Sequence, residues 1–337
     1  MVSVPDGNLT VSAVLPALNA ANTLEAAVDA VLAQTYDGPV DLTIAVGPST
    51  DATAALAARL AAAHAQVSVV HNPTGTTPNG LNAAIGASSG AVIVRVDAQC
   101  VLPPEYVAHA VATMRETGAA NVGGIQHAVG TSKFQQAVAA ALMSPFGQGG
   151  ASFRSGGYSG PTDTVYLGVF DRAALESVGN FNPTYIRNQD YELNWRLREA
   201  GHTVWLDSDL SVDYSPRRTV RSLASQYWQY GRWKARMLSE YPGSTRPRQL
   251  VAPVLVVALV GSVVLLIAGS WLGVVVPIAY VIAVAGAAFV AADRRVGGLW
   301  LRLLAVFPTM HLAWGSGFLA SVPGALFGRR GSSGRRR

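Results

Sequence analysis

The sequence predicts an α/β fold with a mostly parallel sheet, followed by a C-terminal part that lies in a membrane. Two observations carry this prediction. In the N-terminal part, short apolar runs alternate with segments of helical spacing, which is typical of a parallel sheet with helices on both faces. Half of the 337 residues are hydrophobic and only 13% are charged. The apolar excess is concentrated after residue 249, where charged residues become rare.

Five short apolar runs predict the strands of the sheet. Their ranges are Val11–Leu15, Val40–Val46, Val67–Val70, Ala91–Val96 and Val204–Leu206.

The segments between and after these runs carry apolar residues at helical spacing and predict helices. Their ranges are Asn22–Gln34, Ser49 to about His64, Asn79–Ala87, Arg187–Ala200 and the amphipathic Ser222–Tyr241, whose aromatic and basic residues suit a membrane interface.

Polar residues follow several of the predicted strands. Asn19, Ser49–Asp51 and Asp97 all stand where a strand ends. Ligands of open α/β sheets bind outside the carboxyl ends of the strands, so we expect a site at this edge. The Gly- and Ser-rich segment Gly147–Gly160 predicts a mobile loop over that site.

Three apolar stretches make up the C-terminal part. Leu250–Gly269 and Leu272–Ala292 carry no charged residue and are each long enough to cross a bilayer, which disfavours three buried helices of a soluble domain. Trp300–Phe327 contains Pro308 and Pro323, so we expect a broken segment that lies in the interface or re-enters the membrane. An ordinary third membrane helix is the alternative.

The charge distribution favours a membrane partner over nucleic acid. The net charge is +5, and the chain ends on Arg329, Arg330 and Arg335–Arg337. Beside apolar segments, such a basic tail suits the anionic cytoplasmic leaflet. The single cysteine, Cys100, excludes an intramolecular disulfide, and Met1–Thr10 has neither the basic start nor the apolar run of a signal peptide.

Three short patterns could carry chemistry. Asp97 and Gln99 follow an apolar strand and could hold a divalent cation against a diphosphate, although such residues are more often turn or cap residues. Asp190 could act as a general base, or could simply complement the dipole of the helix that begins there. The cations of Gln229–Lys234 could stabilise a charged leaving group, or could snorkel from an interfacial helix.

In this order and spacing, the patterns resemble the inverting family 2 glycosyltransferases. The matching segments are Pro16–Asn19, Ser49–Thr53, Asn79–Asn82, Asp97–Gln99, Asp190 and the Gln-x-x-Arg-Trp motif Gln229–Trp233. Within the family, the chain is most similar to the succinoglycan-type, ExoA-like membrane glucosyltransferases of exopolysaccharide assembly. The segments that carry this similarity are Phe146–Gly147, Asp163–Gly168, Arg187–Asp190, Tyr227–Lys234 and Met310–Gly315.

The resemblance implies the GT-A fold, a nucleotide-sugar-binding domain, and a role for each matching residue. Asp190 is implied as the catalytic base, Asp97 and Gln99 as ligands of Mg²⁺ or Mn²⁺, and Asp163 and Gln229 as acceptor or loop residues. The implied donor-binding residues are Pro16, Asn19, Asp51, Asn82, Asp97, Arg217, Arg232, Trp233 and Lys234.

The chain departs from the family pattern at several of these positions. Val46 and Gly47 stand where the family usually has an acidic pair that helps to bind the base, and Tyr214 stands for a frequent histidine. Gln99 replaces the second carboxylate of the metal motif, so the implied metal site is poorer in charge than usual.

The implied function is inverting transfer of a hexose from a nucleoside-diphosphate sugar, with a UDP-sugar favoured, to a polyprenyl-linked or growing glycan in cell-surface polysaccharide synthesis. We expect a plasma-membrane protein with its catalytic domain in the cytosol. The alternatives are transfer to polyprenyl phosphate and a non-catalytic membrane protein that binds sugar nucleotides. The expected domains are residues 1–218 (catalytic), 219–249 (amphipathic juxtamembrane), 250–327 (membrane or interfacial) and 328–337 (basic tail).

Overall fold

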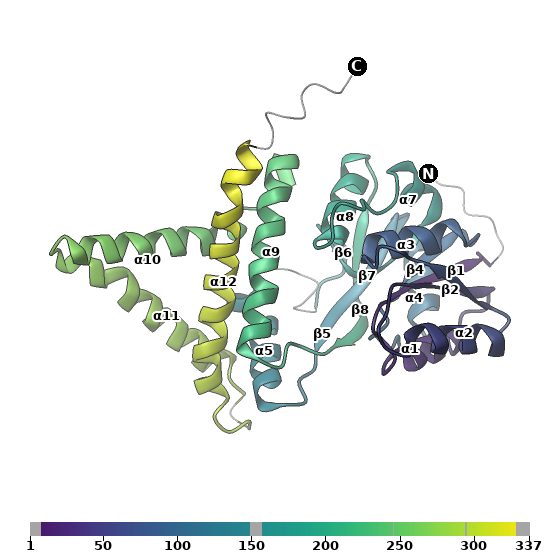
Figure 1. Cartoon of the computed structure of the whole chain (residues 1–337), viewed down its shortest axis with the longest axis horizontal. Helices are drawn as coiled ribbons and strands as arrows, with labels where there is room; N and C mark the ends of the chain where they lie inside the picture. The colour runs from purple at the N-terminus through teal and green to yellow at the C-terminus, as the bar shows by residue number, and fades with distance from the viewer. Residues whose placement is uncertain (1–7, 149–156, 245, 294, 328–337) are drawn as a thin grey trace, which may run out of the picture. The chain divides into compact units, whose positions relative to one another are not determined.

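The computed structural model describes residues 8–148, 157–244, 246–293 and 295–327 (Figure 1). By their internal contacts the residues form two compact units. The first comprises Met1–His127 and Ser152–Tyr214, and the second comprises Ala128–Ala151 and Ser215–Arg337. Residues 128–151 therefore group with the C-terminal helices, although they fall within the predicted catalytic domain.

The first unit is built on an eight-stranded sheet with the order β3-β2-β1-β4-β7-β5-β8-β6. Strands β1 to β4 are parallel to their neighbours within this group, whereas β7 runs antiparallel to β4 and β5, and β6 runs antiparallel to β8. The strands are β1 (Val11–Ala17), β2 (Val40–Val46), β3 (Val67–His71), β4 (Val92–Arg95), β5 (Asn121–Ala128), β6 (Gly160–Pro161), β7 (Tyr166–Asp171) and β8 (Val204–Tyr214). The predicted α/β class is confirmed.

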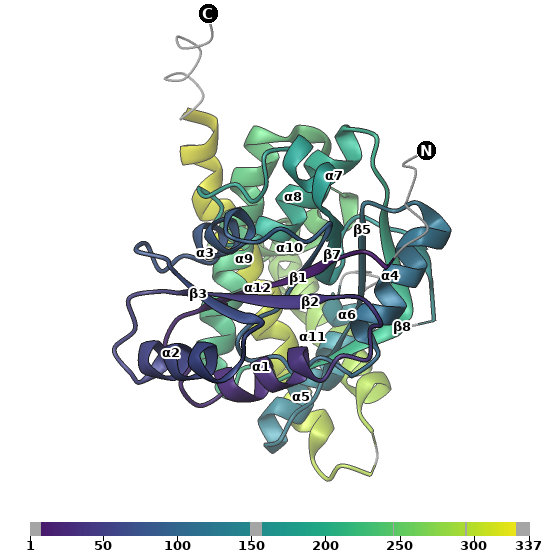
Figure 2. The ribbon, with the colours of Figure 1, turned by 90° about the vertical axis from the view of Figure 1, so that its right-hand side faces the viewer.

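Helices cover both faces of this sheet (Figure 2). Helices α1 (Leu24–Leu32), α2 (Thr53–Ala63) and α4 (Tyr106–Thr117) share one buried cluster, and α3 (Thr77–Gly86), α7 (Arg172–Ser177) and α8 (Gln189–Glu199) share the other. The strands alternate between the two clusters, as the pleat requires. Within β4, for example, Val94 faces the first cluster and Ile93 the second.

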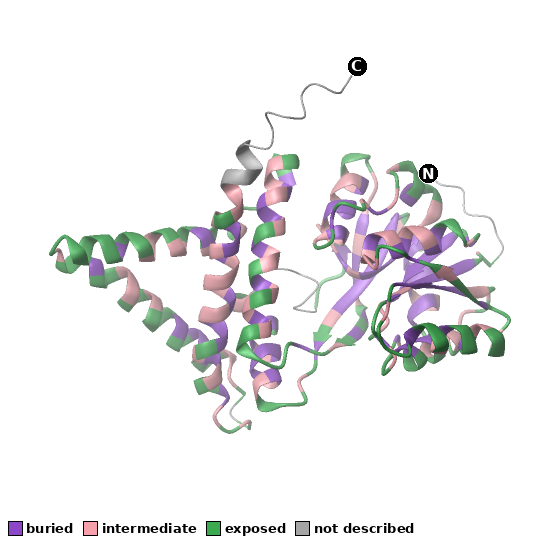
Figure 3. Ribbon diagram, viewed as in Figure 1, coloured by how far each residue is buried: buried purple, intermediate pink, exposed green. Residues whose placement is uncertain are grey.

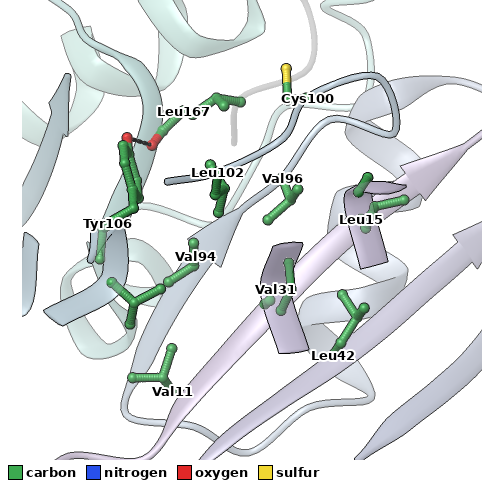
Figure 4. Close-up of a cluster of buried hydrophobic side chains, with 14 of the residues drawn as sticks. Val11, Leu15, Val31, Leu42, Val94, Val96, Cys100, Leu102, Tyr106 and Leu167 are labelled. Atoms are coloured by element: carbon green, nitrogen blue, oxygen red, sulfur yellow. Dashed lines mark hydrogen bonds between the residues drawn. The ribbon is translucent and has the colours of Figure 1, made fainter. Parts of the chain in front are cut away.

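The first cluster contains a large polar side chain whose hydroxyl is satisfied. Tyr106 is 1% exposed, and its hydroxyl donates to the carbonyl of Leu167 at 2.8 Å (Figure 4). A buried hydroxyl without such a partner would oppose folding. With it, the ring contributes about 1.5–3 kcal/mol through the apolar area that it removes from water.

Two elements differ in length from the prediction for physical reasons. Helix α2 begins at Thr53 and not at Ser49, because Asp51 accepts hydrogen bonds from the backbone and hydroxyl of Thr53 and holds the preceding residues in a loop. Strand β8 continues beyond Leu206 to Tyr214. Its polar middle hides the strand pattern. Asp207 is buried there with its carboxylate satisfied, because the Thr113 hydroxyl and the Asp209 N–H donate to it at 2.6 and 3.1 Å.

The second unit is helical in the residues described. Its α-helices are α5 (Lys133–Met143), α6 (Pro145–Gln148), α9 (Val220–Glu240), α10 (Val251–Ile267), α11 (Val275–Ala291) and α12 (Leu299–Phe327). Short 3₁₀ turns at Pro242–Ser244, Pro247–Leu250 and Trp271–Val274 connect some of them. Three segments are long and apolar enough to cross a membrane: Pro247–Ile267, Trp271–Ala291 and Leu299–Val322.

These three segments do not have the same surroundings. Helices α10 and α11 project as a hairpin, whereas α12 runs beside α9 (Figure 1). Only 11% and 17% of the most apolar windows of the first two segments are buried, against 39% for the third, and α10 and α11 are correspondingly exposed along most of their length (Figure 3). The hairpin therefore presents apolar side chains on nearly all sides, as lipid contact requires.

The expected break in Trp300–Phe327 is wrong, because α12 is one continuous helix of 29 residues. Pro308 removes one backbone donor but does not end the helix, since α12 is supported by its contact with α9 along its length. In the same turn, the hydroxyl of Thr309 donates to the carbonyl of Ala305 at 2.7 Å, which supplies a further bond. Most of the predicted loop Gly147–Gly160 lies outside the described residues.

Asn82 ties α3 to the segment that precedes α8. Its amide nitrogen donates to the carbonyl of Phe181 at 2.7 Å, and its amide oxygen accepts from the Phe181 N–H at 3.0 Å. The side chain thus pairs with both backbone groups of one residue, 99 positions away in sequence. Phe181 is itself fully buried, so neither backbone group could exchange this partner for bulk water.

Replacement of Asn82 by alanine should therefore destabilise the first unit by about 1–3 kcal/mol, because it leaves a buried donor and acceptor unpaired. The measurement is the urea-unfolding midpoint of the detergent-solubilised protein. Asn79→Ala in the same helix is the control, since within the described residues the Asn79 side chain bonds only to the nearby Thr76 hydroxyl. An unchanged midpoint with weakened donor binding would instead make Asn82 a donor ligand.

Candidate active site

The carboxyl end of β4 brings together three charged side chains. Arg95 is the last residue of β4, and Asp97 follows two residues later. The guanidinium of Arg95 donates to Asp97 Oδ1 through Nε at 3.2 Å and through Nη2 at 2.9 Å. Its Nη1 donates to Oδ1 of Asp190, from the first turn of α8. The two aspartates that the sequence analysis singled out are therefore held on one arginine.

The burial of Arg95 makes this cluster electrostatically strong. Arg95 is 6% exposed, so its charge interacts with the carboxylates in a low-dielectric setting. Burial alone would lower the pKa of Arg95, but the two carboxylates more than reverse this and raise it. The guanidinium stays charged, and it neutralises about one of the two negative charges beside it.

Asp190 keeps a partly accessible carboxylate with a perturbed pKa. Its side chain is 36% exposed, so one edge can meet a ligand. Burial of the rest raises the pKa of Asp190 above the ordinary carboxyl range, and the charge of Asp97 adds to this, although Arg95 opposes it. A base with a raised pKa accepts a proton more readily than an ordinary carboxylate.

The neighbouring acid, Glu192, has a different role. It is fully buried and makes a bidentate ion pair with Arg196, with Nε to Oε1 and Nη2 to Oε2 both at 2.8 Å. Arg196 also donates to the carbonyls of Val178 and Asn180. Glu192 therefore holds α8 in place, and Asp190 is left as the accessible carboxylate of this turn.

Asp97 and Gln99 suit a hard cation in the type of atom that they offer. Both hydrogen bonds from Arg95 fall on Oδ1 of Asp97, so Oδ2 takes no hydrogen bond among the described residues, and Gln99 is exposed. Carboxylate and amide oxygens are the ligands that Mg²⁺ and Mn²⁺ accept. Asp97 and Gln99 together carry one negative charge, and Arg95 compensates about half of it because it is shared with Asp190. These residues therefore fit a cation that also takes ligands from a bound diphosphate.

A second group with metal-ligating side chains was not foreseen. His109 on α4, with Asp207 and Asp209 on β8, offers ligand atoms that all lie within 4.8 Å of one another. Asp207 Oδ2 contacts His109 Nε2 at 3.1 Å and accepts from the Thr113 hydroxyl at 2.6 Å. The group could hold a metal ion, but these hydrogen bonds satisfy the buried carboxylate without one.

The loops after β1 and β2 are tied together by the polar residues that sequence analysis placed there. Asn19 Oδ1 accepts from the Thr50 N–H at 2.8 Å, and the Asn19 N–H donates to Ser49 Oγ at 3.0 Å. Asp51 Oδ2 accepts from the Ala21 N–H at 3.1 Å. Asn19 lies in the left-handed region, with φ of 49°, which asparagine tolerates better than most residues. These bonds shape the edge of the sheet at which a donor is expected.

Asp51 is ionised over a wider pH range than an ordinary carboxyl. The hydroxyl and backbone N–H of Thr53 donate to its Oδ1, and these bonds lower its pKa. It remains exposed and negatively charged at the start of the loop-to-helix turn. Val46 and Gly47 complete the end of β2 without any acidic side chain, as the departure from the family pattern implied.

The remaining predicted residues of the first unit have specific partners. Pro16 lies near the end of β1, beside Ala45 of β2. Asp163 pairs with Arg198 of α8 at 3.4 Å. Both polar atoms of the Asn82 amide pair with the backbone of Phe181, and its implied role in donor binding stays a prediction.

The buried thiol of Cys100 and the partly buried phenol of Tyr166 lie near Asp97. Cys100 and Tyr166 contact each other through Sγ and the hydroxyl oxygen at 3.0 Å, and the Cys100 N–H donates to the Asp97 carbonyl. Burial raises the pKa of Cys100 to about 12, so this thiol is unreactive near neutral pH.

The other predicted residues belong to the second unit. Arg217 and Arg232 are exposed, Gln229 contacts Ser225 one turn earlier, and Trp233 carries the guanidinium of Arg236 over its ring at 5.1 Å. Lys234 is only 4% exposed, and its Nζ donates to the Ser244 carbonyl at 3.1 Å. This bond ties α9 to the turn at Ser244, and the implied contact of Lys234 with a diphosphate stays a prediction.

Arg95 is the functional residue that sequence reasoning missed. The signal was present, since a lone cation interrupts the apolar run Ala91–Val96 two residues before Asp97. A buried cation in a strand needs carboxylate partners. Asp97 is the near partner, but only the fold shows that Asp190 is the other.

Comparison with known proteins agrees with this geometry. The description "Glycosyl transferase family 2" matches residues 12–179. The chain is 31% identical over 309 residues to the succinoglycan biosynthesis protein ExoA of Rhizobium meliloti (strain 1021), covering 90% of this chain and 92% of that protein.

Among solved structures, the chain is similar to the mannosyltransferase PcManGT from Pyrobaculum calidifontis, solved with GDP-Man and Mn²⁺. The TM-score is 0.60 at 16% identity, covering 96% of this chain and 89% of the other. Residues 1–349 of S. aureus TarS give a TM-score of 0.48 at 13% identity, covering 94% and 92%. The first of these likenesses supports a GT-A fold for the α/β unit.

The family match, the curated relative and the carboxylate pair at the carboxyl end of β4 lead to one conclusion: the chain belongs to glycosyl transferase family 2 and is a glycosyltransferase.

Proposed function

We propose that the chain is an inverting hexosyltransferase of exopolysaccharide assembly, which moves a sugar from a nucleoside-diphosphate donor to a lipid-linked glycan. The observation that carries this proposal is the partly exposed Asp190, held with Asp97 on the buried Arg95. The similarity to a succinoglycan biosynthesis protein supports the exopolysaccharide setting.

In this mechanism Asp190 removes the proton from an acceptor hydroxyl as its oxygen attacks the anomeric carbon. The bond between that carbon and the diphosphate breaks, and the nucleoside diphosphate leaves with the electron pair. Attack from the face opposite the leaving group inverts the anomeric centre. Arg95 orients the base and keeps it ionised enough to act, since the guanidinium opposes the effect of burial on its pKa.

The diphosphate needs positive charge as it leaves. A divalent cation, when bound by Asp97 and Gln99, supplies part of it, and Mn²⁺ in the structure of the Pyrobaculum mannosyltransferase supports this choice of cofactor. The exposed Arg217 and Arg232 are proposed to supply more. Asn19 and Asp51 shape the loops that are proposed to receive the nucleotide. The favoured donor is a UDP-sugar.

The membrane segments are proposed to bring the enzyme to an acceptor that cannot leave the bilayer. Basic residues flank the hairpin where the chain enters and leaves it, with Arg246 and Arg248 before α10 and Arg295 after α11. The turn between α10 and α11 carries the exposed Trp271. This distribution supports a cytosolic base for the hairpin and a cytosolic catalytic unit.

A second candidate is transfer to polyprenyl phosphate itself, which the same site and membrane anchor would serve. Consumption of the nucleotide sugar by the purified protein distinguishes the two, when polyprenyl phosphate and a polyprenyl-linked glycan are supplied separately. Donor binding without consumption in either case would instead support a non-catalytic binding protein.

Asp190→Asn should leave donor affinity nearly unchanged and lower the transfer rate by about a hundredfold or more, because a positioned base contributes roughly that much. Single-turnover transfer of a labelled sugar measures it. Asp213→Asn serves as the control, since Asp213 is an exposed carboxylate of the same unit. A near wild-type rate in Asp190→Asn would make Asp190 a helix-capping residue only.

Arg95→Gln should move the acidic limb of the pH–rate profile to higher pH. Without the guanidinium, the carboxylate form of Asp190 loses its stabilising charge, so its pKa rises further and the base is protonated at a higher pH. Arg95→Lys, which keeps the charge, should move the limb less. A limb that stays in place in Arg95→Gln would show that another group titrates.

Asp97→Ala should abolish cation-dependent donor binding, and Gln99→Asp should strengthen cation binding, because a second carboxylate adds charge to a site for hard cations. Calorimetric titration with Mn²⁺ in the presence of nucleotide provides the measurement. Equal Mn²⁺ affinity in the wild type and both variants would place the cation elsewhere, with the His109, Asp207 and Asp209 group as the next site to test.

The C-terminal tail should lie on the cytosolic side, as expected if the hairpin is the only part that crosses and α12 stays with α9. A single cysteine at Ser333 in a Cys100→Ser background reports this in intact cells treated with a membrane-impermeant thiol reagent. Labelling only after lysis is expected. Labelling before lysis would mean that α12 is a third crossing and that the tail is external.

A further inference from the structure

Helices α9 and α12 approach so closely that their backbones touch at two glycines. A Cβ atom added to Gly231 of α9 would overlap the carbonyl oxygen of Trp314 and lie 2.8 Å from the Phe318 nitrogen. A Cβ atom added to Gly317 of α12 would overlap the carbonyl oxygen of Trp228 and lie 2.9 Å from its carbonyl carbon. Small residues at such points let helices come into backbone contact.

The two contacts are reciprocal. Trp228 and Gly231 stand three residues apart on α9, as Trp314 and Gly317 do on α12. Residues with this spacing share one face of a helix, so each helix offers a glycine and a tryptophan carbonyl to the other. The register between α9 and α12 is thereby set in both rotation and translation.

A third glycine clamps α12 from another side. A Cβ atom added to Gly315 would overlap the Ala252 carbonyl oxygen of α10 and lie 2.7 Å from its carbonyl carbon. Helix α12 is thus seated against α10 as well as α9. These contacts account for the sequence Trp-Gly-Ser-Gly at residues 314–317, to which the transfer chemistry assigns no role.

Gly231 stands in the middle of the Gln-x-x-Arg-Trp motif. It is buried against α12, whereas the next residue, Arg232, is exposed. Lys234 and Met237, on the buried side of the same helix, are 4% and 0% exposed. One face of α9 is therefore fastened within the second unit, and the direction in which Arg232 projects depends on the seating of that face.

We propose that Gly231 and Gly317 are positioning residues for sugar transfer, which set the placement of Arg232 through the backbone contact between α9 and α12. This inference rests on the proposed role of Arg232 at the diphosphate. An added methyl group at either glycine meets backbone and not a flexible side chain, so the helices must separate or rotate. A misplacement of about 1 Å by a change away from the chemistry can cost roughly a hundredfold in rate.

The first test compares Gly231→Ala and Gly317→Ala with Gly261→Ala and Gly286→Ala in the full-length protein. The control glycines lie within α10 and α11, where an added Cβ atom meets nothing within 4 Å. The transfer rate per folded molecule is measured together with the unfolding midpoint. We expect at least a tenfold loss in kcat for the first two variants and wild-type kcat for the controls. A kcat per folded molecule that is unchanged in Gly231→Ala and Gly317→Ala would overturn the proposal.

A double-mutant cycle separates positioning from general damage. If Gly231→Ala acts by moving Arg232, then Gly231→Ala/Arg232→Ala transfers no more slowly than Arg232→Ala alone. Losses that multiply in the double variant would show that Gly231 acts by another route. The added Cβ atom of Gly315→Ala would lie nearest to Ala252 and Val256 of α10. The rate losses of Gly315→Ala and Arg232→Ala should therefore multiply in the double variant.

Two further measurements keep the outcome decisive. If the glycine variants do not fold, the cycle is run with Phe318→Leu, which changes the side chain stacked on Trp314 next to the contact without a backbone overlap. If the wild type binds donor but transfers no sugar, the proposed function fails by itself. The cycle is then measured on the affinity for UDP or GDP, whichever raises the wild-type unfolding midpoint. Independent effects of Gly231→Ala and Arg232→Ala on that affinity would overturn the positioning role.

Discussion

The ion pairs of the buried Arg95 guanidinium are the interaction on which the arrangement of the candidate site depends. A charge at this depth is tolerated only with carboxylate partners, and it takes one from its own strand end and one from the first turn of α8. The strand end and the helix are thereby fixed relative to each other. Glu192 and Arg196 fasten the same helix through a fully buried ion pair, which leaves the Asp190 carboxylate accessible at a defined place.

The same residues show how one short segment divides structural and chemical roles. Asp190 and Glu192 are two positions apart and both stand near the start of α8. Their surroundings differ, because Glu192 is fully buried and pairs with Arg196, whereas Asp190 is partly exposed and pairs with Arg95 at the end of β4. Similarly, the resemblance implies Asn82 as a donor ligand, whereas in the structure its amide forms a pair of hydrogen bonds with the backbone of Phe181.

In the second unit, helices are fixed relative to each other by backbone contact, whereas in the first unit ion pairs fix the end of β4 relative to α8. The motif helix α9 is seated on α12 by Gly231 and Gly317, and its end is held by the bond from Lys234 to the Ser244 carbonyl. Helix α12 is consequently more than an apolar anchor, and it differs from the exposed hairpin of α10 and α11 in burial. Its continuity through Pro308 follows from this support, which a lone helix would lack.

The sequence by itself determined the α/β class, the four parallel strands and the apolar C-terminal segments, and it singled out Asp97 and Asp190 as candidate site residues. These features depend on local periodicity, on turn residues and on motif order, all of which can be recognised in the amino-acid sequence. Only the tertiary structure decided the partners of Arg95, the hydrogen-bond partners of Asn82 and Lys234, the full length of β8 and the contact between α9 and α12. Each of these depends on residues far apart in sequence, such as the 95 positions between Arg95 and Asp190. No local sequence pattern predicts such a contact, because the burial of a side chain and its partner depend on how the helices and strands pack.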